Sequence, residues 1–314
     1  MTSMEAEHAL PPRKAATNST ASTLQGLSIS SWLEPIGHAV LTSADGLALN
    51  AYYAGSHGKP PVLLINPIGV SVLLLAPLMR HLGQDYFVLS WETRGLPSLN
   101  PDREEISTRI DDHLDDACRI LDHYGVDAVD LVSYCSGTSI ALSLLGAGRI
   151  KVSKAVFISP SVLIEEKIPM TNHQRTVVPI WADVVKKGRA YCTIMSNLMG
   201  PKRPHHGDVQ AELDYVNRLP FVDGSSTYQY ARLLASVNQV RYSDLFDKLS
   251  IPVLLLHATD DELIHVELSR YMDRRICNSN LHLVEKGGHY AICKNEAMHA
   301  AISGYLAGRQ PVEG

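Results

Sequence analysis

The sequence predicts an α/β fold with a mostly parallel central sheet and helices on both faces. Short apolar runs recur along the chain, and helical periodicity or turns separate them. Most of the runs are continuously apolar, which is typical of parallel strands covered on both faces. The alternation indicates right-handed crossovers within one sheet. The expected strands cover residues 39–42, 47–53, 61–65, 86–90, 129–133, 155–159, 253–257 and 281–284.

Local signals support this order of elements. Asp45-Gly46 lies between the first two expected strands and predicts a hairpin turn. Between residues 106 and 124 apolar residues recur every three or four positions, which predicts an amphipathic helix. The aspartates of this segment are expected to cover its solvent face, and they are Asp111, Asp112, Asp115 and Asp116.

The chain divides into three expected parts. Residues 1–30 are rich in Ser, Thr, Ala and Pro, so we expect a flexible leader. Residues 31–161 and 249–314 carry the strand–helix alternation and form the expected core. The alternation breaks between residues 162 and 248, where helical stretches and polar turns predict a cap inserted over the carboxyl edge of the sheet.

Composition excludes several classes of protein. With 314 residues, 45% of them hydrophobic, and a net charge of −5, neither wholesale disorder nor a basic nucleic-acid-binding surface is expected. No apolar run approaches the ~20 residues of a membrane span, and no secretory signal begins the chain, so we expect a cytoplasmic protein without membrane contact. Five cysteines without CxxC spacing argue against a disulfide framework or a zinc site. No glycine-rich phosphate loop follows a strand, so no nucleotide cofactor is expected.

The strongest motif follows the strand at 129–133. Cys135 stands between the small residues Ser133 and Gly137, and a helical stretch follows directly. This is the pattern of a nucleophile elbow, in which a sharp turn exposes the nucleophile and small flanks let strand and helix approach each other. The helix N-terminus would stabilise a thiolate. A buried, unreactive cysteine after a core strand is the alternative.

Two later segments favour the catalytic interpretation. The strand at 253–257 leads into an acidic turn that holds Asp260 and Asp261, and the strand at 281–284 leads into Gly-Gly-His289. The chain order is thus nucleophile, acid and histidine, each just past the carboxyl end of a strand. Open α/β sheets place their sites at that edge.

With these motifs the chain resembles the α/β-hydrolase superfamily over residues 37–161 and 249–308, here with a cysteine at the elbow. The resemblance implies a triad of Cys135, Asp261 and His289, with Asp260 as the neighbour to test. A family loop of the form Asp-x-Arg-Gly is represented by Glu92-Thr93-Arg94-Gly95.

The same resemblance implies an oxyanion hole made of two backbone N–H groups. One belongs to Ser136, directly after the nucleophile, and the other is placed at Ile68 in the loop after the third strand. The family usually has His-Gly in that loop, where this chain has Asn66-Pro67. Tyr134, beside the nucleophile, is a candidate substrate contact, with packing as the alternative.

The choice of cysteine as the nucleophile indicates the type of reaction. An acyl group on cysteine is a thioester, so its exchange with another thioester is nearly isoenergetic. A cysteine elbow with an inserted cap resembles carrier-protein acyl- and aminoacyltransferases of natural-product pathways, and also thioesterases. We predict an acyltransferase that moves an acyl group between carrier-protein or pantetheine thioesters, without a cofactor of its own. The alternatives are a thioesterase or esterase with the same triad and a non-catalytic receptor.

The expected partner is an acyl or peptidyl carrier protein. The segment 162–248 holds eleven lysines and arginines against nine acidic residues, whereas the rest of the chain is acidic. A basic cap would attract an acidic carrier protein, and ordinary surface charge is the alternative. The basic residues that cluster in the cap are Lys186, Lys187, Arg189, Lys202 and Arg203.

Overall fold

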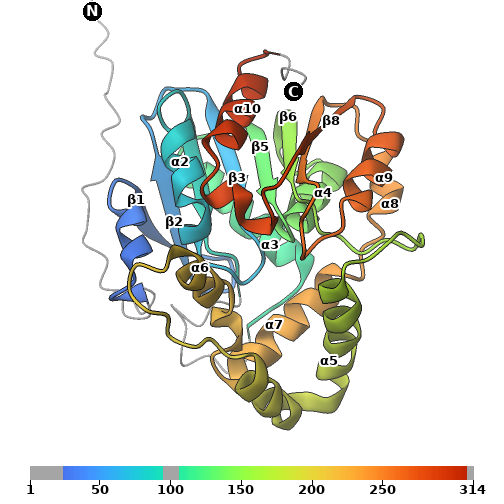
Figure 1. Cartoon of the computed structure of the whole chain (residues 1–314). Coiled ribbons are helices and arrows are strands. Elements are labelled where there is room, and N and C mark those ends of the chain that lie inside the picture. The colour runs from blue at the N-terminus through green and yellow to red at the C-terminus, as the bar shows by residue number, and fades with distance from the viewer. Residues whose placement is uncertain (1–23, 95–105, 310–314) are drawn as a thin grey trace, which may run out of the picture.

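The computed structural model describes residues 24–94 and 106–309. These residues form an eight-stranded sheet with the order β1-β2-β4-β3-β5-β6-β7-β8 (Figure 1). Strand β2 runs antiparallel to β1 and β4, and the other neighbours are parallel. The expected mostly parallel α/β sheet is therefore confirmed. The strands are β1 (Gly37–Thr42), β2 (Ala48–Ala54), β3 (Pro61–Ile65), β4 (Phe87–Trp91), β5 (Ala128–Tyr134), β6 (Lys151–Ile158), β7 (Val253–Ala258) and β8 (Ser279–Val284).

Helices cover both faces of the sheet, as predicted (Figure 1). Successive residues of one strand enter different cores: Leu64 packs with α2 (Ala76–Leu82) and α10 (Glu296–Leu306), and Leu63 with the opposite layer. This double burial explains why the strands are continuously apolar. The opposite layer consists of α3 (Ile110–His123), α4 (Gly137–Ala147), α8 (Ser243–Phe246) and α9 (Glu267–Arg275).

One of the four aspartates of α3 departs from the prediction. Asp116 is fully buried, and its carboxylate accepts hydrogen bonds from Nε of Arg94 at 2.6 Å and from Nη2 of Arg94 at 2.7 Å. Arg94 also reaches Asp45 in the β1–β2 turn, at 2.8 Å. A buried carboxylate is tolerated only when it is paired, so the expectation of a solvated position is wrong for Asp116.

The segment between β6 and β7 is helical and has a small core of its own. Helices α5 and α7 pack side by side beyond the sheet (Figure 1). Helix α5 is interrupted at Gly188, where φ is 75°. The helices are α5 (Asn172–Met199), α6 (Val209–Asn217), η3 (Leu219–Phe221) and α7 (Gly224–Val237). The buried side chains of this core are Trp181, Val184, Cys192, Met195, Phe221 and Ala231.

The start of α5 is tied to the loop that follows β7. Thr171 Oγ1 donates to the carbonyl of Leu263 at 2.9 Å, and Gln174 Oε1 accepts from the N–H of His265 at 3.1 Å. Since β7 is parallel to its neighbours, this loop lies at the carboxyl edge of the sheet. The division of the chain into core and cap at residues 161 and 249 stays a prediction.

Residues 24–30 do not behave as part of the expected flexible leader. Leu24, Leu27 and Ile29 are at most 4% exposed. The carboxylate of Glu212 in α6 accepts from the N–H groups of Ser28 and Ile29, each at 3.0 Å. Three apolar side chains and a buried carboxylate therefore hold this segment against α6, and the leader prediction is wrong for it. Residues 1–23 lie outside the described residues.

The remaining elements are short 3-10 helices: η1 (Ser28–Leu33), η2 (Val72–Leu75) and η4 (His289–Cys293). Among the helices of residues 24–94 and 106–309, none is both long enough and apolar enough to cross a membrane.

Candidate active site

Cys135 lies at a sharp turn between β5 and α4. Its φ of 50° is in the left-handed region, which is strained for a residue with a side chain. A Cβ on Gly137 would lie 2.5 Å from the carbonyl oxygen of Asn66, so α4 approaches β3 closely only because this position is glycine. The half-buried thiol stands at the N-terminus of α4, whose dipole favours an anion there.

His289 and Asp261 form a buried pair. Nδ1 of His289 lies 2.8 Å from Oδ2 of Asp261, and the two residues are 5% and 7% exposed. The other carboxylate oxygen, Oδ1, accepts from the N–H groups of Leu263 and Ile264 at 2.9 and 2.8 Å. Burial raises the pKa of Asp261, but the hydrogen bonds to His257 and His289 more than offset it, so the pKa lies below its usual range.

Cys135 and His289 interact directly. Burial lowers the pKa of His289, whereas the charge of Cys135 and the hydrogen bonds to Asp261 and Cys135 raise it to about 10. A proton that leaves Cys135 is therefore held firmly by His289, because the negative charge left on sulfur raises the pKa of the imidazole. The structure thus brings together the three residues that the sequence predicted as a triad.

Asp260, the neighbour of Asp261, bonds to backbone groups and not to the imidazole. Oδ1 of Asp260 accepts from the N–H groups of Gly287 and Gly288, each at 2.8 Å, at the start of the loop that carries His289. Gly288 has a φ of 63°, which favours glycine. Of the two candidate acids, Asp261 contacts the imidazole, and Asp260 holds the backbone that leads to it.

The two predicted oxyanion donors are also adjacent, but in an unexpected arrangement. The N–H of Ile68 donates to Oγ of Ser136 at 2.9 Å. The following N–H, that of Gly69, donates to Oγ1 of Thr93 at 2.8 Å, which fixes the loop. The Ile68 donor therefore already has an acceptor, namely the side chain of the residue that supplies the other predicted donor.

Tyr134 is placed behind His289 and not in an open site. Its side chain is 1% exposed, its ring centroid lies 5.1 Å from that of His289, and its hydroxyl donates to the carbonyl of His289 at 2.8 Å. The expected substrate contact is therefore corrected: in this structure Tyr134 contacts the backbone of the loop that carries His289, because its position at the end of β5 directs it into the core.

Two residues near the site were not predicted. His257 of β7 is fully buried, with Nε2 at 3.1 Å from the carbonyl of Ile264 and 3.4 Å from Oδ2 of Asp261. Its position four residues before Asp261, near the end of β7, was the signal in the sequence that could have identified it. Tyr230 of α7 packs on Gly69, where a Cβ would lie 2.8 Å from its ring. No sequence pattern indicated this contact, since it joins the cap to the loop after β3.

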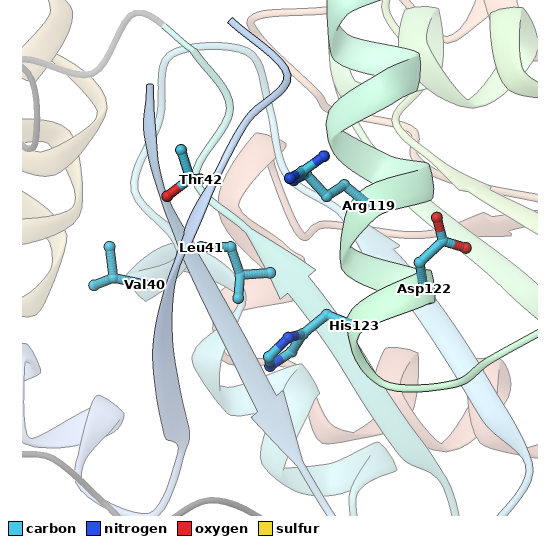
Figure 2. Close-up of a pocket in the computed structure, with 6 residues that line it drawn as sticks. All are labelled: Val40, Leu41, Thr42, Arg119, Asp122 and His123. Atoms are coloured by element: carbon cyan, nitrogen blue, oxygen red, sulfur yellow. The ribbon is translucent and has the colours of Figure 1, made fainter. Parts of the chain in front are cut away.

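Two hollows on the described part of the surface include none of the three triad residues in their lining. Figure 2 shows one of about 550 Å³ between edge strand β1 and helix α3, and none of the predicted site residues lines it. A second, of about 300 Å³, lies between α6 and the segment on either side of His289, and it is lined by Gln210, Lys286, Gly287, Tyr290, Ala291, Lys294 and Asn295. Within the described parts of the chain, no group of three or more His, Cys, Asp or Glu residues is arranged to hold a metal ion.

Residues 60–296 match the sequence model of the alpha/beta hydrolase fold family. The chain belongs to this family.

Solved structures of varied enzymes share the fold. A membrane phospholipase A is 16% identical, with a TM-score of 0.68, and the match covers 92% of this chain and 94% of that one. A haloalkane dehalogenase variant from Bradyrhizobium elkanii is 18% identical, with a TM-score of 0.68 and coverage of 87% and 97%. The esterase RhEst1 from Rhodococcus sp. ECU1013 is 19% identical, with a TM-score of 0.63 and coverage of 86% and 98%. At such identities the likeness establishes the fold alone.

Proposed function

We propose that this protein forms an acyl-enzyme on Cys135 and hydrolyses a thioester or an ester. The observation that carries the proposal is the buried His289, which is hydrogen-bonded to Asp261 at 2.8 Å and whose pKa is raised by the charge of the neighbouring Cys135. A nucleophile, a base and a group that orients the base are the parts that nucleophilic acyl transfer requires.

The reaction proceeds in two halves. His289 takes the thiol proton, and Sγ of Cys135 attacks the acyl carbon while the carbonyl electron pair moves onto oxygen. Collapse of this intermediate breaks the bond to the leaving thiol or alcohol, which receives the proton from His289. Water, deprotonated by His289, then attacks the acyl-enzyme and breaks the C–S bond, which releases the acid and restores the thiol. Asp261 keeps the imidazole in the productive orientation throughout.

Hydrolysis is the leading interpretation because the enzymes of the same fold include an esterase and a phospholipase A, which are named for ester cleavage. Water needs no dedicated site on the protein, whereas a second acyl acceptor does. Transfer is therefore the more demanding hypothesis.

One observation keeps transfer to a pantetheine thiol as the second candidate. Lys286 and Lys294 line the 300 Å³ hollow together with Tyr290, the residue after His289. Two ammonium groups suit the phosphate of a pantetheine arm. The acyl-cysteine is itself a thioester, so it can pass its acyl group to such a thiol with little change in free energy.

The basic residues of the cap support a carrier-protein partner less strongly. Lys187 pairs with Asp183 at 3.2 Å and lies 4.6 Å from the ring centroid of Tyr191. Arg189 lies 5.5 Å from the ring centroid of Tyr228. These side chains are engaged within the cap, so docking of an acidic carrier would have to compete with contacts already formed.

The first experiment asks whether Cys135 carries the acyl group. The protein is incubated with p-nitrophenyl and coenzyme A thioester donors, and the intact mass is measured after acid quenching. The wild-type protein and Cys277→Ala, which removes an exposed thiol away from the site, should gain one acyl mass. Cys135→Ala should gain none. An acyl mass retained in Cys135→Ala would overturn the proposal.

The second experiment separates hydrolysis from transfer. Isolated acyl-enzyme is timed in buffer with and without pantetheine and with and without a holo-carrier protein. Decay in buffer at the steady-state turnover rate supports hydrolysis. An acyl-enzyme that persists in buffer and is discharged quickly by the carrier-bound thiol supports the transferase, and double charge reversal at Lys286 and Lys294 should then slow that discharge.

A further inference from the structure

The contact between Ile68 and Ser136 lies next to the nucleophile. An inference about its part in forming the acyl-enzyme rests on the proposed function. The Ile68 N–H donates to Oγ of Ser136 at 2.9 Å. A hydroxyl has one donor and two acceptor lone pairs, so Oγ can accept this bond and still donate its own hydrogen. Ser136 is half-buried and follows the nucleophile directly.

We propose that the Ser136 hydroxyl is itself an oxyanion donor, polarised by the Ile68 N–H behind it. The backbone N–H of Ser136, at the start of α4, has no acceptor within its helix and supplies the second donor. The oxyanion would then be held by two donors of one residue. The Ile68 N–H acts through the hydroxyl, since a hydrogen bond received by a hydroxyl strengthens the one that it donates.

The loop geometry supports this arrangement. Ile68 is completely buried, and the next N–H, that of Gly69, is bonded to Thr93. Tyr230 packs on Gly69 from the cap side, where a Cβ would lie 2.8 Å from its ring. The loop is thus held at Gly69, directly after Ile68, by a hydrogen bond and by the packing of Tyr230, and this favours the direction of the Ile68 N–H toward Ser136.

The alternative is a competing contact. If the Ser136 side chain only occupies the Ile68 N–H, the hydroxyl must leave before the oxyanion forms, and the serine then slows the reaction. The two arrangements predict opposite changes in the acylation rate when the Ser136 hydroxyl is removed: a decrease if it is a donor and an increase if it is a competitor. This difference makes a single substitution decisive.

The experiment compares wild type, Ser136→Ala and Ser136→Thr in single-turnover acylation by a p-nitrophenyl ester. Loss of one oxyanion donor lowers the rate constant by about 10²–10³-fold, so the acylation rate of Ser136→Ala should fall by ~10²-fold with little change in KM, because the oxyanion forms only on the way through the transition state. Ser136→Thr, which keeps a hydroxyl, should recover most of the rate. Alkylation of Cys135 by iodoacetamide forms no oxyanion and should change less than about twofold in both variants, which separates this effect from damage to the nucleophile.

An acylation rate in Ser136→Ala equal to or above the wild-type rate would overturn the inference and assign the Ile68 N–H as a direct donor. Equal losses in Ser136→Ala and Ser136→Thr, together with slower alkylation, would also overturn it, since they indicate a structural role. A wild-type protein that forms no acyl-enzyme would instead overturn the proposed function, and the inference with it.

Discussion

Substitution of Asp261 by asparagine tests the candidate triad at its most constrained point. Oδ1 accepts two backbone N–H groups, and asparagine keeps that oxygen, so the loop after β7 should hold its shape. At the Oδ2 position an NH2 group would face Nδ1 of His289, now 2.8 Å away, and Nε2 of His257, 3.4 Å away. Because His257 Nε2 also lies 3.1 Å from the carbonyl of Ile264, it carries the hydrogen, and two donors would face each other.

The expected magnitudes follow from these contacts. His289 would have to accept at Nδ1, which puts its proton on Nε2 and leaves no base for the thiol. The corresponding change in serine triads lowers turnover by about 10⁴-fold. A thiol is intrinsically more nucleophilic than a hydroxyl, so we expect a loss of ~10²–10³-fold here. One unsatisfied donor pair costs about 1–3 kcal/mol, so the variant should remain folded but less stable.

The assay is single-turnover acylation combined with thermal unfolding, with Asp260→Asn as the matched control. Asp260→Asn keeps an acceptor for the loop N–H groups and should retain most of the activity. The pKa of His289 should also fall in Asp261→Asn, because a charge that raises it has gone. Activity within about tenfold of wild type in Asp261→Asn would refute the assignment of this residue as the orienting acid.

Three further outcomes are expected. Asp260→Ala, which removes the acceptor of two loop N–H groups, should slow acylation by about tenfold where Asp260→Asn does not, as measured by single-turnover kinetics. Gly137→Ala would place Cβ 2.5 Å from the Asn66 carbonyl and should lower both the thermal midpoint and Cys135 alkylation, whereas Gly304→Ala, with open space around it, should lower neither. Burial raises the pKa of Glu212, but hydrogen bonds from Ser28 and other donors lower it to about 2 from 4.5. Its stabilisation of ~1–3 kcal/mol is therefore complete above pH 4.5 and lost as pH falls toward 2, and the difference in unfolding free energy between wild type and Glu212→Gln should shrink over that range.

The sheet was predictable because its signals are local. Continuous apolar runs such as 61–65 and 253–257 match β3 and β7 to within one residue, since both faces of these strands are covered. The turn at Cys135 was also predictable, because a Cβ at position 137 would lie 2.5 Å from the carbonyl oxygen of Asn66, the residue directly after β3, so the position requires a small residue. Backbone geometry of this kind leaves few choices of residue and therefore leaves a pattern in the sequence.

The long-range partners of polar residues were not predictable. Asp116 belongs to a run of aspartates that is otherwise typical of a solvent face, and only its pairing with Arg94 explains its burial. Ser28 bonds to Glu212 across 184 positions of the chain, which no local pattern reveals. Tyr134 was expected to contact substrate because it stands beside Cys135. The alternation of side chains along β5 instead directs its ring against His289. Each error concerns what a side chain meets in space, which depends on the assembled fold.

The loop after β7 connects these observations, because it joins three parts of the site within a few residues. Asp260 holds the start of the His289 loop, Asp261 holds the imidazole, and Glu262 Oε2 accepts from the N–H of His289 at 3.3 Å. Three residues further on, the N–H of His265 donates to Gln174 at the start of α5. The same short segment therefore fixes the base and anchors the helix that begins the cap. A displacement of α5 should therefore change the orientation of His289 through this loop, since Gln174, Asp260, Asp261 and Glu262 are joined by these hydrogen bonds.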